Sequence, residues 1–229
     1  MEIHTVRGGT KEEFCNGEYN LAVPISLGNR WFTEQSVLEL VQFSLPYAKE
    51  FLVVYVADTI HAVNIEVRNR RSRNGALRKA KRMGREFLLS VQQTLSANLH
   101  VTEKDKVFYK NWDDLLTDDY LKKQKFLYDK YKKDSDFRRE IKRLVKNTTS
   151  MEEKGFSEEE IEKLGNYIIE ELPELLMRVP IDGLQFDANV YPFDNDLLVL
   201  VEDIQKGRKF PEIAKEMIDS KNKVFVEVR

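Results

Sequence analysis

The chain has 229 residues, of which 41% are hydrophobic and 33% charged, and its formal net charge is -2 at pH 7. This length predicts a single domain over residues 1–229, and the apolar content is sufficient for a sizeable core. The one cysteine, Cys15, excludes a disulfide framework within the chain, and three scattered histidines argue against a metal site built from protein ligands.

The N-terminal segment does not have the composition of an export signal, because it lacks a charged stretch followed by an apolar core. No apolar run approaches the ~18 residues that are needed to span a membrane. We therefore expect a cytoplasmic protein that makes no membrane contact.

The first twenty residues are polar and predict an irregular lead-in, and an apolar run follows them. Residues 21–26 are typical of a buried strand. Ser26-Leu-Gly-Asn29 has the composition of a turn, and residues 37–47 predict a helix that ends near Pro46. A strand, a tight turn and a helix in this order place the turn at the carboxyl edge of a parallel sheet, where ligands bind in open α/β folds.

A second apolar run, over residues 51–57, is rich in β-branched and aromatic residues and predicts another strand. Two buried strands joined by a helix form a βαβ unit. Such a unit favours a parallel sheet and a Rossmann-like α/β fold. Residues 107–109 predict a third strand.

The strongest charge feature lies between these strands. Nine cations occur without any acidic residue between them: Arg68, Arg70, Arg71, Arg73, Arg78, Lys79, Lys81, Arg82 and Arg85. A helix is predicted from residue 76 onward, because apolar or small residues recur at helical spacing: Leu77, Ala80, Gly84, Leu88, Val91 and Leu95. Such a run is either a solvated face or a binding surface for a polyanion such as a nucleic-acid backbone. The absence of opposing charges within the run favours the second interpretation.

The remaining chain alternates helical and extended patterns. Residues 118–147 predict a long charged helical region whose aromatic residues lie in the core, and residues 148–155 predict a loop. Ser157 and Glu160 form a capping box at the start of a helix over residues 161–172, which ends or kinks at Pro173. The later predictions are a loop over 182–189, a strand end or turn over 189–192, a strand or helix over 197–201, a helix over 210–218 and a strand over 223–229.

Phosphate-binding motifs are missing from the sequence. Neither G-x-x-x-x-G-K-[ST] nor G-x-G-x-x-G occurs, which argues against an ATPase, a kinase or a nicotinamide enzyme.

Ser26 is either a simple turn serine or a nucleophile. Pro24-Ile-Ser26-Leu-Gly28 is close to the nucleophile elbow G-x-S-x-G. A Ser-His-Asp hydrolase would need a histidine late in the chain, and none follows His100. If Ser26 is a nucleophile, another group must therefore handle its proton.

Tyr167 and Glu171 form a second candidate pair. They are four residues apart on a predicted helix, so they share a face with the apolar Leu164. A phenol and a carboxylate on such a face could bind an ammonium group. The alternative is an exposed acidic helix, because Glu170 and Glu174 are neighbours.

Together these features resemble the tRNA-dependent cyclodipeptide synthases, from about residue 21 to the end of the chain. That family has a serine after an apolar strand, followed by an asparagine and an aromatic pair, and a Tyr-x-x-x-Glu-x-Pro helix. The matching segments here are Ser26-Leu-Gly-Asn29-Arg-Trp-Phe32 and Tyr167-Ile-Ile-Glu-Glu171-Leu-Pro173. The family's basic helix matches residues 78–85, and its late active-site tyrosine matches Tyr191.

The resemblance implies a three-layer, Rossmann-like α/β fold with a central, mainly parallel sheet. This fold is similar to the catalytic domain of class I tyrosyl- and tryptophanyl-tRNA synthetases but lacks their ATP-binding signatures. The implied activity is cyclic dipeptide (2,5-diketopiperazine) synthesis from two aminoacyl-tRNAs by a ping-pong route, without cofactors. A monomer is expected.

The resemblance also implies roles for individual residues. Ser26 would attack the aminoacyl ester, and Glu171 and Tyr167 would hold the α-ammonium group. Asn29 would orient the acyl group, and Tyr191 would relay protons. Residues implied to line the first aminoacyl pocket are Ala22, Pro24, Val54 and Asn147. Residues implied to bind tRNA are Arg78, Lys79, Lys81, Arg82 and Arg85.

One departure from the family pattern lies in this pocket, since Pro24 stands where members usually carry glycine. We expect it to reshape the pocket.

Two other functions stay open on the sequence. A non-enzymatic RNA-binding module with the same fold would need the basic helix but not Ser26, Tyr167 or Glu171. An aminoacyl-tRNA hydrolase would use the same serine and release free amino acid.

Overall fold

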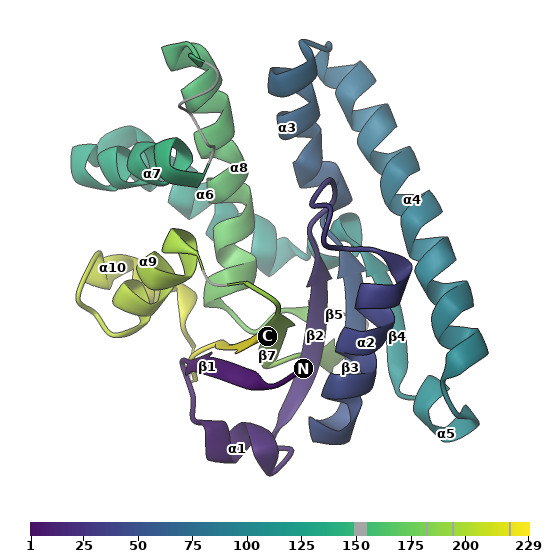
Figure 1. The fold of residues 1–229 in the computed structure, drawn as a ribbon. Coiled ribbons are helices and arrows are strands. Elements are labelled where there is room, and N and C mark those ends of the chain that lie inside the picture. Colours follow the sequence, from purple (N-terminus) through teal and green to yellow (C-terminus); the bar gives the residue numbers. More distant parts are fainter. Residues whose placement is uncertain (149–154, 182, 194, 220) are drawn as a thin grey trace.

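A six-stranded sheet forms the centre of the computed structural model, which describes residues 1–148, 155–181, 183–193, 195–219 and 221–229 (Figure 1). Its strands run in the order β1-β8-β7-β2-β3-β4. Neighbouring strands are parallel except β1 and β8, which are antiparallel. The prediction of a mainly parallel sheet is confirmed. The strands are β1 Ile3–Arg7, β2 Tyr19–Ile25, β3 Ala48–Val56, β4 Val107–Asn111, β7 Ala188–Tyr191 and β8 Val224–Val228.

The direction of chain progression reverses between β2 and β7. From β2 the chain moves outward through β3 to β4, whereas β7 and β8 lie on the other side of β2. In open α/β sheets, ligands bind at the carboxyl ends of the strands where this reversal occurs. Ser26 directly follows β2, and Tyr191 is the last residue of β7.

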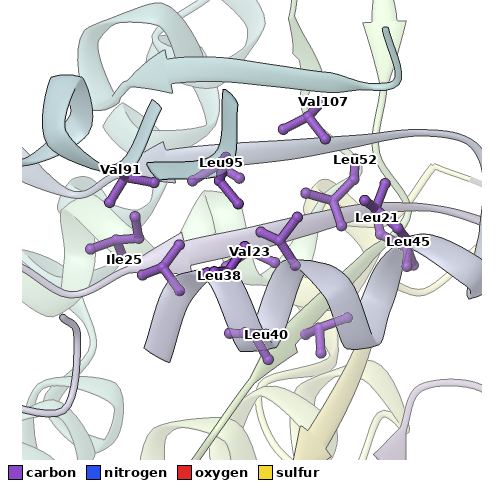
Figure 2. Packing of buried hydrophobic residues seen from close by; sticks show 14 of the residues in the cluster. Leu21, Val23, Ile25, Leu38, Leu40, Leu45, Leu52, Val91, Leu95 and Val107 are labelled. Atoms are coloured by element: carbon purple, nitrogen blue, oxygen red, sulfur yellow. The ribbon is translucent and has the colours of Figure 1, made fainter. Parts of the chain in front are cut away.

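One face of the sheet is covered by α2 (Glu34–Ser44) and α4 (Arg73–Asn98). Side chains alternate along a strand, so every second residue of β2 and β3 points to this face. Figure 2 shows the resulting packing, in which the strand residues Leu21, Val23, Ile25 and Leu52 lie with Leu38, Val91 and Leu95 of the two helices.

The opposite face packs against a second helical layer. Val53, Tyr55 and Ala22 point to this side and contact a cluster that includes Trp112, Tyr120 and Phe186. α8 (Glu158–Leu176) contacts α3 (Asp58–Asn69), and Figure 1 shows both helices at the carboxyl end of β2. The two helical layers and the sheet confirm the predicted three-layer α/β fold. The other elements on this side are η2 Trp112–Leu115, α6 Asp118–Lys133, α7 Ser135–Thr148, α9 Asp196–Gln205 and α10 Pro211–Met217.

Short elements complete the fold. These are α1 Lys11–Cys15, η1 Leu45–Tyr47, α5 Val101–Lys104, β5 Pro180–Ile181 and β6 Leu184–Gln185. Within the described residues, no helix is both long enough and apolar enough to cross a membrane.

Several predicted elements need correction. The lead-in is not irregular, because it contains β1 and α1. β1 is an edge strand whose pairing with β8 involves residues more than 200 positions away, so no local pattern reveals it. The helical region predicted over 118–147 is confirmed, and it consists of two helices separated at Asp134.

The later segments give a mixed result. α8 does not end at Pro173 but continues to Leu176, within a segment whose residues pack in the core. The predicted loop over 182–189 contains β6 and the start of β7, and residues 197–201 are helical. The capping box at Ser157, the strand end at Tyr191, and the helix and strand predicted near the end of the chain are confirmed. Most of the predicted loop over 148–155 lies outside the described residues.

Candidate active site

A cavity of about 640 Å³ opens where the strand order reverses. Its lining comes from the end of β2, from β3, α3, α8, β7 and the start of α9. The cavity is lined by all five residues that were predicted to be catalytic: Ser26, Asn29, Tyr167, Glu171 and Tyr191. They come from three separate parts of the sequence.

The turn that presents Ser26 depends on Gly28. The Asn29 N–H donates a hydrogen bond to the Ser26 carbonyl at 3.2 Å, which closes the turn. Gly28 has φ +84°, in the left-handed region that glycine adopts without strain. A Cβ atom at this position would lie 2.9 Å from Cε1 of His61, so the turn also packs too closely for a side chain.

Ser26 and Tyr191 are direct partners. Ser26 Oγ and the Tyr191 hydroxyl oxygen are 2.8 Å apart, and either can donate. The Tyr191 ring contacts the rings of Phe32 and Phe193, with centroid distances of 5.6 and 5.8 Å. Burial raises the pKa of Tyr191 to about 12, although the hydrogen bond with Ser26 opposes part of this rise. The phenol is therefore protonated at neutral pH and can donate and accept at the serine oxygen.

Tyr167 and Glu171 lie on the face of α8 that lines the cavity. Burial, followed by the charge of Glu174, raises the pKa of Glu171 to about 8. Burial and then Glu171 raise the pKa of Tyr167 well above its ordinary value. The alternative of an exposed acidic helix is wrong, because Glu174 is only 1% exposed and both Glu170 and Glu171 are partly buried.

Asn29 is exposed at the cavity edge. Its Oδ1 accepts a hydrogen bond from the Trp31 N–H at 3.0 Å, so its amide nitrogen is the group that can donate toward the cavity. The Asn29 side chain also interacts with Tyr191.

The four residues predicted to line the first aminoacyl pocket occupy different places in the structure. Pro24 lines the cavity, whereas Ala22, Val54 and Asn147 are not among the lining residues. Val54 follows the strand alternation and points to the opposite face of the sheet, where it is fully buried.

The other two positions have different partners. Ala22 is fully buried in the cluster beneath the cavity. The Asn147 amide donates to Asp196 at 2.7 Å, on the exposed surface of α7.

The structure confirms that α4 is a helix with an inward apolar stripe. Two of its cations, however, lie close to acidic side chains. The buried residues of α4 confirm the inward stripe: Ala76, Ala80, Gly84, Leu88, Val91 and Leu95. Leu77, which was predicted to belong to the stripe, is partly buried. Lys81 pairs with Asp113 at 2.7 Å, and Arg82 lies 4.0 Å from Glu86. Arg78 and Arg85 are exposed, and Lys79 is partly exposed.

Some residues of the cavity were not predicted. Tyr55, Glu174 and Asn189 line its buried part. A signal existed for each: Tyr55 pairs with Pro24 across β2 and β3, Glu174 lies one turn after Glu171, and Asn189 shares a strand face with Tyr191.

His61 on α3 was also missed. Burial, with the charges of Arg68 and Lys79, lowers its pKa to about 4, so the imidazole is neutral at pH 7. Within the described residues, no group of three or more His, Cys, Asp or Glu side chains could hold a metal ion.

Comparison with known proteins places this α/β architecture in one family. The family model for cyclodipeptide synthases matches residues 9–208, so the chain belongs to the cyclodipeptide synthase family. It is an enzyme, an aminoacyltransferase that forms cyclic dipeptides from aminoacyl-tRNAs. A search of curated proteins found no match.

Solved structures of similar proteins share the fold at low sequence identity. A cyclodipeptide synthase from Bacillus thermoamylovorans has a TM-score of 0.72 at 16% identity, covering 95% of this chain and 91% of that one. A Mycobacterium tuberculosis protein, described as showing that these enzymes are related to type I tRNA synthetases, has a TM-score of 0.71 at 19% identity, covering 98% and 94%. The cyclodipeptide synthase of Candidatus Glomeribacter gigasporarum, solved bound to phenylalanyl-tRNA, has a TM-score of 0.55 at 17% identity, covering 92% and 88%.

Proposed function

We propose that this synthase works through an aminoacyl ester on Ser26. The observation that supports this most is the 2.8 Å contact between Ser26 Oγ and the Tyr191 hydroxyl, in a cavity that also holds Glu171. A serine nucleophile is weak unless a neighbouring group handles its proton. Tyr191 occupies the place that a histidine fills in many serine enzymes.

In the first step, Ser26 Oγ attacks the ester carbonyl of an aminoacyl-tRNA. The ester bond to the terminal ribose breaks, and the serine proton passes through the Tyr191 hydroxyl to the leaving ribose oxygen. Asn29 orients the acyl group through an N–H of its amide, which has a second N–H for Tyr191. The ester of the tRNA is already activated, so no ATP is consumed.

Glu171 and Tyr167 hold the α-ammonium group of the acyl-enzyme. The ammonium must lose a proton before it can attack the ester of a second aminoacyl-tRNA. An α-amino group has an ordinary pKa of about 7.7–8.0, and the pKa of Glu171 is about 8. In the empty cavity this pKa leaves Glu171 mostly protonated at pH 7. A bound ammonium group favours the charged carboxylate, which can then take the ammonium proton.

The amine then forms the peptide bond, and the second tRNA leaves as the free ribose hydroxyl. The dipeptide remains on Ser26 until its new amine attacks the seryl ester. This attack closes the ring and returns the proton to Ser26, with Tyr191 as the relay.

The exposed cations of α4 bind the acceptor end of each tRNA. Arg78, Lys79, Lys81, Arg82 and Arg85 lie on one helix, and phosphate contacts from such a face give salt-dependent affinity without sequence selection. We further propose a monomer with one domain that acts where aminoacyl-tRNA is present, in the cytoplasm.

Expression in a bacterial host, followed by mass spectrometry of the medium, tests this proposal. The expected result is a set of cyclic dipeptides that disappears with Ser26→Ala and persists with Ser96→Ala, which alters an exposed serine of α4. Release of free amino acids from aminoacyl-tRNA would indicate the hydrolase instead. Binding of tRNA without any turnover of its ester would indicate the RNA-binding module.

A further inference from the structure

The buried part of the cavity contains polar groups that the acyl-transfer steps do not use. Glu174 is 1% exposed and Asn189 is 2% exposed, and both line the cavity together with Tyr55. We call these three residues the polar floor. Burial and the carboxylate of Glu174 raise the pKa of Tyr55 well above its ordinary value, so its phenol stays protonated.

The charge of the polar floor is already balanced. Lys223 is completely buried, and its Nζ donates to Glu174 Oε1 at 2.9 Å. The same Nζ lies 3.7 Å from the ring centroid of Phe186. A buried ion pair is weak evidence for stability, because removing two charges from water costs as much as their attraction returns. A role in recognising a ligand would explain why such a pair lies beside a cavity.

Asn189 has one polar atom without a partner. Its Nδ2 donates to Glu174 Oε1 at 3.0 Å, and since a carboxylate only accepts, this contact fixes the orientation of the amide. Its Oδ1 is buried and has no hydrogen-bond partner. An unsatisfied buried acceptor costs about 1–3 kcal/mol. A donor brought by the substrate would remove this cost.

If the acyl group is held by Ser26 and Glu171, as the proposed function has it, the polar floor lies below these two residues. Asn189 is two residues before Tyr191 on β7, and so about 7 Å deeper along the strand. Glu174 is three residues after Glu171 on α8, about 4.5 Å further along the helix. An aminoacyl group held through Ser26 and Glu171 therefore directs its side chain to this floor.

We propose that the polar floor selects, as the first aminoacyl group, an uncharged side chain that ends in an N–H or O–H donor. An apolar side chain leaves Asn189 Oδ1 unpaired. An acidic side chain has no donor and lies against the Glu174 carboxylate. A cationic side chain meets a carboxylate that Lys223 already neutralises.

The test uses pairs of aminoacyl groups of nearly equal size on one tRNA body. The tRNA is charged with tyrosine or phenylalanine, and in a second pair with glutamine or methionine. Intact-protein mass spectrometry measures the initial rate of acylation at Ser26. In at least one pair, tyrosine or glutamine, which carries the donor, is expected to react at least about tenfold faster than its partner. This ratio follows from the cost of leaving the buried acceptor of Asn189 unsatisfied.

Substitution of the acceptor gives an independent measurement. Asn189→Leu is expected to reduce the rate ratio within the selective pair to about one, whereas the exposed Asn98→Leu leaves it unchanged. Equal or faster acylation by phenylalanine and methionine in the wild-type enzyme would overturn the proposal, and this comparison does not depend on how well a variant folds. Failure of all four substrates to acylate Ser26 would instead contradict the proposed function.

Discussion

The cavity and the basic face of α4 differ in how they hold the side chains that we propose bind the aminoacyl-tRNA. In the cavity, Ser26, Tyr191 and Glu171 are held by hydrogen bonds and burial, and the pKa values of the tyrosine and the glutamate are shifted by their surroundings. On α4 the charges are exposed or paired with surface acids, as Lys81 is with Asp113. The buried groups should therefore act as a unit in catalysis, whereas the surface cations should contribute small and separate amounts to affinity.

The largest effect is expected from Ser26→Ala. Removing the nucleophile should reduce cyclic dipeptide formation at least about 1,000-fold, as with other nucleophile deletions. Affinity for tRNA, measured by filter binding, should stay within about twofold, because the α4 surface is untouched. Product formation by this variant at an appreciable rate would exclude the covalent route.

Glu171→Gln should lower activity and raise stability together. The rate of cyclic dipeptide formation should fall by about 100-fold, because the ammonium group of the acyl-enzyme loses its counter-ion and its base. The folded protein binds the Glu171 proton more tightly than the unfolded chain, since the pKa rises from 4.5 to about 8. The wild-type free energy of unfolding therefore decreases as pH rises through this window.

The variant should lack this decrease, which amounts to roughly 4 kcal/mol of the wild-type free energy of unfolding between pH 4.5 and pH 8. Urea unfolding at pH 5 and pH 8 measures the difference between the two proteins. A parallel pH response of wild type and variant would show that Glu171 titrates near its ordinary value.

Tyr191→Phe should slow turnover by about 100-fold, the lower end of the range for a lost proton-transfer group. The phenyl ring can keep its contacts with Phe32 and Phe193, so KM should change little. Tyr109→Phe, on β4 and outside the cavity lining, is the matched control. A change in KM at constant kcat would assign Tyr191 to binding rather than to proton transfer.

The smallest effects are expected on α4. Arg85→Ala should weaken tRNA binding by about three- to tenfold and lower the salt slope by about one. Lys81→Ala should have less effect because Asp113 already neutralises that lysine. Lys11→Ala, on exposed α1, is the control, and titration at several salt concentrations is the measurement. Equal salt slopes in all three variants would leave the α4 face without a role in binding.

The contrast between the two regions also explains what the sequence could predict. The α4 face and the parallel strands were visible because their signals are local: a run of cations, helical spacing and apolar runs bounded by turns. The candidate catalytic residues were predicted through a family resemblance, since nothing local links Ser26 to Tyr191. Their contact arises only because β2 and β7 are neighbours in the sheet.

The errors have the same origin. Val54 was assigned to the pocket, but strand alternation turns it to the other face, while its neighbour Tyr55 lines the cavity. β1 was missed because its partner β8 is at the far end of the chain. The Lys223–Glu174 pair was missed because a lone lysine beside a terminal strand is normally exposed, and only the packed structure shows it buried.

The central claim is that Ser26 carries the substrate. Mixing the enzyme with a single aminoacyl-tRNA and measuring the intact protein mass tests it most directly. We predict an adduct equal to one aminoacyl residue, located by peptide mapping on Ser26, lost on adding a second aminoacyl-tRNA and missing in Ser26→Ala. Formation of cyclic dipeptide without any adduct, or with the adduct on another residue, would contradict the account.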